Sequence, residues 1–332
     1  MTQFFGHDDA ERTFLRAYHG NRLHHAWLLA GPEGIGKASF ARRVAGHVLT
    51  RDRTDASDML QADPANVGTN MIAQDRHPDL HWLALGPKDD KEARKQEDGK
   101  PFERARSIRI AQVRALQKRL NVRPSLSERR VIVIDPVDLL ERNAANELQK
   151  SFEETHAINL YLSIAHNPGR LLPTIRSRCL TLRFAPLSDE RMIEALRNAR
   201  PEAGEGELRA LATLGQGAPG QALAYAGLDM AAVHDVLDRI ASSGDRDHRG
   251  RIALSTMVAG KAQQPRFQAL LRLAPSFAAE RIKRLPPRAM SDAIAARQEM
   301  VALAGRSVLL NLDAQSVAFQ IGGLLTRLAG PR

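Results

Sequence analysis

The sequence contains a single cysteine, Cys179, among its 332 residues. A disulfide framework and a thiolate zinc site both need several cysteines, so neither is expected. A catalytic thiol at Cys179 stays formally open, although its sequence neighbours give it no support.

Long apolar runs are also missing. No stretch reaches 18 apolar residues, and the first 14 residues carry acids and a histidine instead of a basic segment followed by an apolar one. We therefore expect a soluble, cytoplasmic protein without membrane spans. With 43% hydrophobic and 26% charged residues, the chain can bury two or three ordinary cores.

Positive charge is concentrated near the C-terminus. The formal net charge is +10, and residues 245–332 hold 14 Lys and Arg against 6 Asp and Glu. Such a surface could meet nucleic acid or an acidic partner, or it could be a solvated face of Arg-rich helices. The lack of interleaved aromatic residues favours the solvated face.

Five short apolar runs, separated by helical patterns, predict a parallel sheet covered by helices in the first 184 residues. The runs lie at 27–30, 80–85, 131–134, 160–164 and 180–184. After the third run, apolar residues at i, i+4 spacing predict one amphipathic helix that carries Leu140, Ala144, Leu148 and Phe152. The fold class is therefore α/β.

Residues 86–106 are charged or polar with few apolar positions, which predicts a mobile, solvated insertion. Beyond the turn at 185–187 the pattern is helical throughout, with glycine-rich breaks near 204–206, 215–220 and 242–244. We predict three parts: an α/β domain at 1–184, a small helical domain at 185–242 and a helical domain at 243–332.

A glycine-rich loop follows the first apolar run. Residues 31–37 fit the pattern G-x-x-x-x-G-K, with Gly31, Gly34 and Gly36 before Lys37, between a predicted strand and a predicted helix. Backbone N–H groups in such a P-loop cradle phosphates at the helix N-terminus, and the lysine adds positive charge. We predict a phosphate-binding P-loop fold.

Two groups needed for hydrolysis are missing from this site. The position after Lys37 should carry a hydroxyl that helps to hold magnesium, but it is Ala38. The strand at 131–134 ends in Asp135, yet Pro136 follows where a second carboxylate would activate water. ATP hydrolysis is therefore not expected, whereas nucleotide binding without hydrolysis stays open.

An arginine-rich segment lies between the fourth and fifth apolar runs and contains Arg170, Arg176 and Arg178. A guanidinium there could stabilise transition-state charge on a phosphate held by another subunit. By spacing alone, a surface salt bridge is an equal alternative.

Four segments together resemble the AAA+ clamp-loader ATPases of bacterial DNA polymerase III. They are Leu23-His-His-Ala-Trp-Leu-Leu, His77-Pro-Asp-Leu80, Ala144-Ala-Asn-Glu-Leu148 and Leu171-Leu-Pro-Thr-Ile-Arg-Ser-Arg-Cys179. The resemblance implies an AAA+ module, a helical lid and a helical collar that assembles a ring. It also implies that Arg178 is an arginine finger acting in trans, and that His166 and Asn167 form the sensor 1 region.

Departures from the family pattern point to its non-hydrolysing subunits. Gly220 stands where the resemblance implies that active motors carry the sensor 2 arginine. Many relatives hold zinc with four cysteines after the P-loop helix, but residues 50–74 contain none, so no zinc or other metal is expected. The resemblance implies no required cofactor and no catalysis by the chain alone. Asp135 would be the remnant of the Walker B site.

The implied role is a fixed subunit of a hetero-pentamer within the polymerase holoenzyme. Its partners would be the motor (tau/gamma) subunits, the delta subunit, the sliding clamp and, through the complex, primer-template DNA. Two alternatives remain: an active ATPase motor of the same loader, and a DNA-binding protein that uses its basic C-terminal part.

Overall fold

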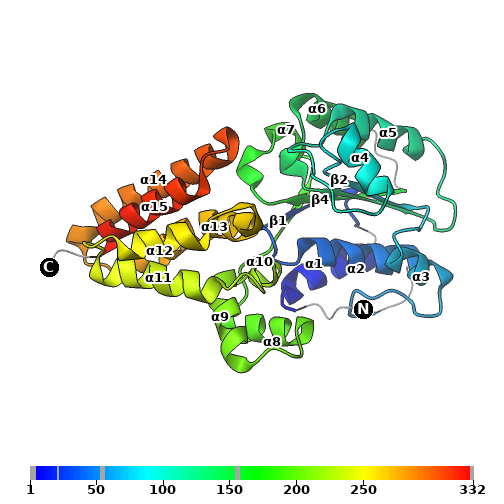
Figure 1. Ribbon diagram of the computed structural model, residues 1–332. Helices are drawn as coiled ribbons and strands as arrows, with labels where there is room; N and C mark the ends of the chain where they lie inside the picture. Colours follow the sequence, from blue (N-terminus) through cyan, green and yellow to red (C-terminus); the bar gives the residue numbers. More distant parts are fainter. Residues whose placement is uncertain (1–4, 21, 53–56, 154–157, 330–332) are drawn as a thin grey trace. The chain divides into compact units, whose positions relative to one another are not determined.

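The computed structural model describes residues 5–20, 22–52, 57–153 and 158–329, which fold into two compact units (Figure 1). The first unit comprises Met1–Ala199 and Gly217–Gly220, and the second comprises Arg200–Gln216 and Gln221–Arg332. The predicted boundaries at 184 and 242 stay predictions.

A five-stranded parallel sheet forms the centre of the first unit. Its strands are β1 (Ala26–Ala30), β2 (Leu80–Ala84), β3 (Arg130–Asp135), β4 (Asn159–Ala165) and β5 (Leu180–Arg183), in the spatial order β2-β3-β4-β1-β5. β1, β3 and β4 are apolar and almost entirely buried, as parallel strands covered on both faces must be. The predicted sheet is confirmed.

Helices cover both faces of this sheet (Figure 1). α1 (Asp8–His19), α2 (Lys37–Thr50) and α3 (Val67–Ala73) lie on one side, and α5 (Ile110–Leu120), α6 (Arg142–Glu153) and α7 (Pro173–Arg176) lie on the other. Successive side chains along a strand point to opposite faces of the sheet, so each strand contributes to two cores. Trp27 belongs to the core that contains Phe14 and Phe40, whereas Leu28 belongs to the core that contains Phe152.

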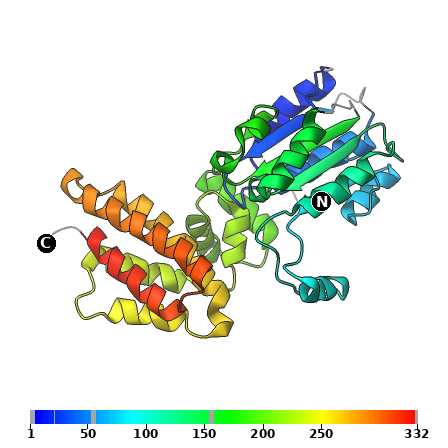
Figure 2. The ribbon, with the colours of Figure 1, turned by 90° about the horizontal axis from the view of Figure 1, so that it is seen from above.

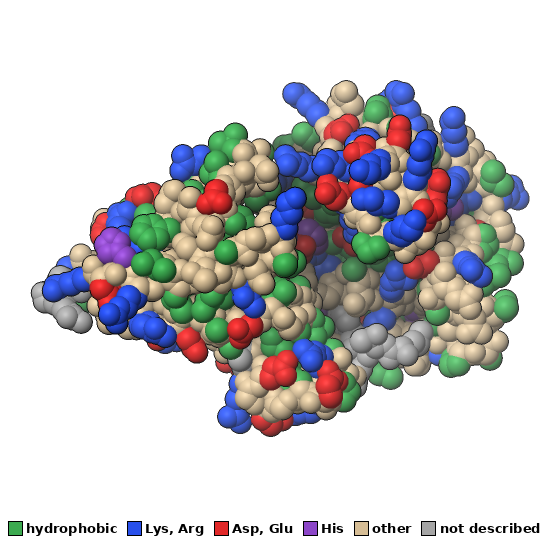
Figure 3. Space-filling model, in the orientation of Figure 1, with side chains coloured by type: hydrophobic (Ala, Val, Ile, Leu, Met, Phe, Trp, Pro, Cys, Tyr) green, Lys and Arg blue, Asp and Glu red, His purple; other side chains and the backbone are tan. Residues whose placement is uncertain are grey.

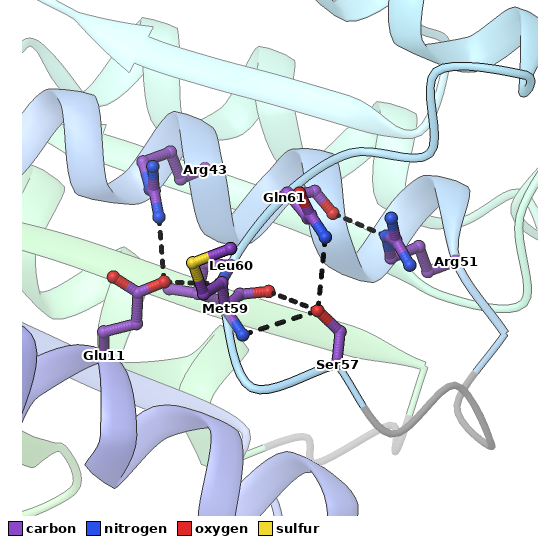
Figure 4. A network of polar contacts seen from close by, with 7 residues as sticks. All are labelled: Glu11, Arg43, Arg51, Ser57, Met59, Leu60 and Gln61. Atoms are coloured by element: carbon purple, nitrogen blue, oxygen red, sulfur yellow. Dashed lines mark hydrogen bonds and ion pairs between the residues drawn. The ribbon is translucent and has the colours of Figure 1, made fainter. Parts of the chain in front are cut away.

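A polar network fastens α1 and α2 to the segment that follows α2 (Figure 4). The buried Glu11 carboxylate pairs with Arg43 at 2.8 Å and accepts the backbone N–H of Leu60 at 2.5 Å. Ser57 and Arg51 bind the same segment through Met59 and Gln61. Glu11 is therefore held by a charged partner and a backbone donor, as a buried carboxylate requires.

The helix predicted to include Leu140 begins later. α6 starts at Arg142, and a 3-10 turn, η1 (Val137–Leu139), precedes it. Between the two, Leu140 pairs with Ile108 in a short β-bridge, in which Ile108 N–H donates to Leu139 and Glu141 N–H donates to Ile108. These backbone bonds delay the helix, although Ala144, Leu148 and Phe152 do form its buried stripe.

The insertion at 86–106 contains a helix that its composition did not predict. α4 (Asp90–Glu97) is held out from the sheet on two connecting segments (Figure 2). The Asp89 side chain caps its N-terminus, and buried Glu92 accepts the backbone N–H of Glu103 at 2.7 Å. Acidic and basic side chains are intermixed over the region of α4 and α5 (Figure 3), in keeping with the predicted solvation.

The second unit is helical, as predicted. α8 (Asp189–Ala199) still belongs to the first unit, and α10 (Pro219–Tyr225) begins there. The second unit contains α9 (Glu205–Gly215), α11 (Met230–Ser243), α12 (Arg249–Met257), α13 (Gln264–Ile282), α14 (Pro287–Leu310) and α15 (Ala314–Leu325). Short 3-10 turns lie at Pro168–Arg170, Lys261–Gln263 and Thr326–Leu328. None of the helices in the described ranges is both long and apolar enough to cross a membrane.

Candidate functional site

The predicted P-loop has the backbone conformation that phosphate binding requires. It joins β1 to α2, and Gly34 and Gly36 adopt φ values of +78° and +108°, a region that favours glycine. Gly31 is equally constrained, because a Cβ there would lie 2.4 Å from the carbonyl oxygen of Phe184. The loop therefore keeps the geometry that directs backbone N–H groups toward an anion at the start of α2.

Lys37 is buried beneath this loop. Its ammonium group donates to the carbonyl oxygens of Gly31 and Pro32, both at 2.6 Å, and the side chain is only 2% exposed. Burial lowers the pKa of Lys37 to about 8, although the nearby Asp135, Asp138 and Glu33 act in the opposite direction. The lysine is held by the loop itself and remains close to three carboxylates.

The magnesium side of the site lacks its usual groups. Ala38 offers no hydroxyl and packs against the core of the sheet. Asp135 ends β3 as predicted. The pKa of its carboxyl is raised overall by burial, although the charges of His166, Lys37 and Arg104 act in the opposite direction. The residues present therefore do not fit a magnesium-bound nucleotide, although the loop and Lys37 fit a phosphate.

The predicted sensor 1 residues, His166 and Asn167, lie close to Asp135. Asp138 accepts the backbone N–H groups of His166 and Asn167 at 3.0 and 2.9 Å, which ties the end of β4 to the segment after β3. Burial lowers the pKa of His166, and its Nδ1 has no hydrogen-bond partner within the described part of the chain. Asp138, set aside in the sequence because of its spacing, thus supports the site through the backbone.

Gly220 occupies the predicted sensor 2 position and packs directly on the P-loop. Its N–H donates to the carbonyl oxygen of Gly34 at 2.8 Å. A Cβ at Gly220 would lie 2.9 Å from that oxygen and 3.1 Å from the Cα of Gly34. The backbone of Gly34 therefore occupies the space that the side chain of an arginine at position 220 would need.

Arg178 lies near the amino-terminal end of β5, at the opposite end of the strands from the P-loop. β5 begins at Leu180, which is paired with Trp27 near the start of β1, whereas the P-loop follows the end of β1. Four residues of strand, about 13 Å, separate Trp27 from Gly31. The predicted site residues therefore lie in two places. Arg178 lies apart from the others, which come together at the ends of β1, β3 and β4: Gly31, Gly34, Gly36, Lys37, Asp135, His166 and Asn167.

The guanidinium of Arg178 is held by two neighbours that the sequence did not identify. Nη2 pairs with a carboxylate oxygen of Glu153 at 2.6 Å, and Nη1 donates to the carbonyl oxygen of Thr174 at 2.9 Å. The sequence gives no signal for the first contact, because 25 residues separate the two side chains. Within the part of the chain that the structure describes, the other three of its five N–H groups make no hydrogen bond and can meet another acceptor.

Cys179, next to this arginine, is poorly suited to nucleophilic chemistry. Burial raises the pKa of its thiol to about 12, so the reactive thiolate is scarce near neutral pH. Within the described ranges, His, Cys, Asp and Glu form no group of three or more that could hold a metal ion.

Comparison with known proteins identifies a family over the α/β part of the chain. A family model described as "DNA polymerase III, delta subunit" matches residues 6–188. The chain is 32% identical over 195 residues to DNA polymerase III subunit delta' of Pseudomonas aeruginosa, covering 59% of this chain and 53% of the relative.

Two further relatives extend the comparison. Subunit delta' of Bacillus subtilis is 33% identical over 180 residues, with 52% of this chain and 47% of the relative covered. Subunit tau of Salmonella typhimurium is 28% identical over 173 residues, with 52% of this chain and 23% of the relative covered. The chain spans about half the length of the delta' relatives that it matches.

Proposed function

Because the chain belongs to the DNA polymerase III delta-subunit family, we propose that it is a non-hydrolysing, delta-prime type subunit of a clamp loader that supplies Arg178 to a neighbouring ATP site. Its partners would be tau/gamma motor subunits and a delta subunit in a hetero-pentamer. The ring would place a sliding clamp on primer-template DNA, and this chain would form one fixed position in it.

The position of Arg178 carries this proposal. The side chain is 35% exposed and lies near the start of β5, at the opposite end of the strands from the P-loop of its own chain. A partly exposed arginine in that place is available to a phosphate that another subunit presents. Its contacts with Glu153 and Thr174 already restrict the rotamers of this side chain, so binding a phosphate costs less side-chain entropy.

The local P-loop supports the non-hydrolysing part of the proposal. Ala38 and Pro136 replace groups for magnesium and water activation, and Gly220 closes the sensor 2 position on the backbone of Gly34. Each loss removes an electrostatic element on which phosphoryl transfer depends. We propose that the loop serves as architecture and that no cofactor is required.

An active tau/gamma-like motor is the second candidate. The similarity to subunit tau and the retained conformation of Gly34, Gly36 and Lys37 favour it. A motor role would require ATP hydrolysis, either by the chain alone or at its own P-loop within the ring.

The test is a reconstituted ring with motor and delta subunits, in which clamp- and DNA-stimulated ATP hydrolysis is measured. Arg178→Ala should remove hydrolysis at the one site that this chain completes, about 10³-fold or more at that site. Lys37→Ala should leave the stimulated rate within about twofold.

Arg176→Ala is the matched control, because Arg176 is exposed two residues away and should leave the rate unchanged. A large loss in Lys37→Ala with no loss in Arg178→Ala would refute the trans-acting arginine and support the motor. Strong hydrolysis by the purified chain would have the same meaning.

A further inference from the structure

The sheet of the first unit ends at an open strand, β2. Among the described residues β2 pairs only with β3, and Val131 N–H donates to the carbonyl oxygen of Asp79. In a parallel ladder alternate residues face the same neighbour, so residues 80, 82 and 84 direct their N–H and C=O groups away from β3. Two of these outward groups are already engaged: the N–H of Leu80 donates to the carbonyl oxygen of His77 at 3.1 Å, and the amide of Gln112 donates to the carbonyl oxygen of Ala84 at 2.9 Å. The remaining outward groups form a short template for another strand.

Two cavities of about 550 and 440 Å³ run along this open edge. They share Asp75, Leu80, His81 and Arg119, so they form one continuous groove. Trp82, Leu83 and Leu116 supply apolar walls near the Gln112 end, and Arg76, Arg123 and Ser125 line the other end. The groove therefore has both apolar surface and free backbone groups.

Positive charge dominates this groove. Arg76, Arg119 and Arg123 are exposed, and none of them makes an ion pair with another residue in the described ranges. The acids of the groove are already engaged: Asp75 pairs with Arg42 at 2.5 Å, and buried Asp79 accepts backbone N–H groups of residues 125–127. Arg42 also lies over the ring of Trp82, 4.8 Å from its centre.

We propose that this groove binds an extended, acidic segment of a partner protein, which adds a strand to β2. The carbonyl of Leu80, both backbone groups of Trp82 and the N–H of Ala84 would pair with the segment, and the three unpaired arginines would meet its carboxylates. The open ladder and the apolar walls favour a peptide over a nucleic acid, which has no backbone N–H and C=O groups to pair with a strand. This surface is separate from both the P-loop and Arg178.

A heptapeptide of alternating glutamate and valine, blocked at both ends, is a suitable probe. The chain has two tryptophans, and Trp27 is fully buried whereas Trp82 lines the groove, so a change in tryptophan fluorescence reports binding beside Trp82. We expect saturable binding to the full chain. Amide hydrogen exchange at Trp82 and Ala84 should slow in the complex.

Two variants separate the backbone contribution from the charge contribution. Ala84→Pro removes an outward N–H and no bond to β3, and proline is tolerated at such edge positions. It should weaken binding about tenfold. The double variant Arg76→Ala/Arg119→Ala should weaken binding at least tenfold. Arg114→Ala should not, because Arg114 is an exposed arginine of α5 that lies outside the groove.

Several results would overturn the proposal. These are no saturable binding at millimolar peptide, equal binding of a heptapeptide in which lysine replaces glutamate, or undiminished binding to Ala84→Pro with native circular dichroism. A twelve-nucleotide oligothymidine that competes with the peptide and binds more tightly would assign the groove to nucleic acid instead. Because the arginine variants alter only exposed side chains, they test the proposal even if Ala84→Pro fails to fold.

Discussion

Lys37, the lysine of the P-loop motif, makes its hydrogen bonds to the loop itself. In an active P-loop the lysine faces phosphate, whereas here its ammonium binds the carbonyl oxygens of Gly31 and Pro32. A protonated lysine in this buried place opposes folding, because burial lowers its pKa from 10.5 to about 8. The opposition disappears when the group loses its proton.

The stability of the first unit should therefore respond to pH through Lys37. The folded chain releases this proton near pH 8 and the unfolded chain near 10.5, so the unfolded state binds more protons between these values and stability rises with pH. Relative to Lys37→Met, the wild-type free energy of unfolding should increase by up to ~3 kcal/mol across that window. Urea unfolding followed by tryptophan fluorescence measures it, since Trp27 and Trp82 both lie in the first unit.

A constant difference between wild type and Lys37→Met from pH 7 to 10.5 would contradict the lowered pKa. His81→Gln, a change at a half-buried titratable group outside the P-loop, is the control and should leave the rise in place.

At the scale of elements, a single carboxylate organises the loop before β3. Asp79 is 1% exposed and accepts the backbone N–H groups of Ser125, Leu126 and Ser127 at 2.7 to 2.9 Å. The His77-Pro-Asp79 segment, which contributed to the family resemblance, thus has a structural explanation. His77 adds a contact from the N–H of Asp79 to its Nδ1.

Asp79→Asn should destabilise the first unit by about 2–4 kcal/mol, because an amide offers one acceptor oxygen and places a donor against backbone donors. The midpoint of urea unfolding, read by tryptophan fluorescence, measures this loss. Asp75→Asn, which alters an exposed ion pair, should change stability by less than about 1 kcal/mol. Similar effects of the two changes would contradict the role assigned to Asp79.

Elements with strong apolar patterns were predictable from the sequence, and elements held by polar contacts were not. The five strands and the P-loop follow from continuous apolar runs and glycine spacing. α4 was missed because its helix depends on the Asp89 cap and on Glu92, which average composition does not register. Likewise, Glu153 meets Arg178 only through the packing of α6 beside α7.

At the scale of the whole molecule, the first unit includes a segment that is distant in sequence. Gly217–Gly220 belongs to it, and two backbone bonds fasten the segment: Leu187 N–H to Gly217 and Gly220 N–H to Gly34. Each such bond contributes about 1 kcal/mol. The unit therefore does not end where its continuous chain ends at Ala199.

A fragment of residues 1–220 should be more stable than one of residues 1–199, by about 2 kcal/mol or roughly 4–8 °C in melting temperature. Thermal unfolding followed by tryptophan fluorescence compares the two. Replacing residues 217–220 by a serine-rich segment of equal length in the longer fragment should remove its advantage. Equal melting of the two native fragments would show that the segment does not stabilise the unit.

The contact of Gly220 with Gly34 also has an evolutionary consequence. Restoring a hydroxyl at position 38 and a carboxylate at position 136 would each require one substitution in side chains. An arginine at position 220, however, would first need the backbone of the P-loop to move away, since even a Cβ lies 2.9 Å from the oxygen of Gly34. Under the proposed non-hydrolysing role, a return to hydrolysis with a sensor arginine would therefore need a backbone rearrangement as well as new side chains.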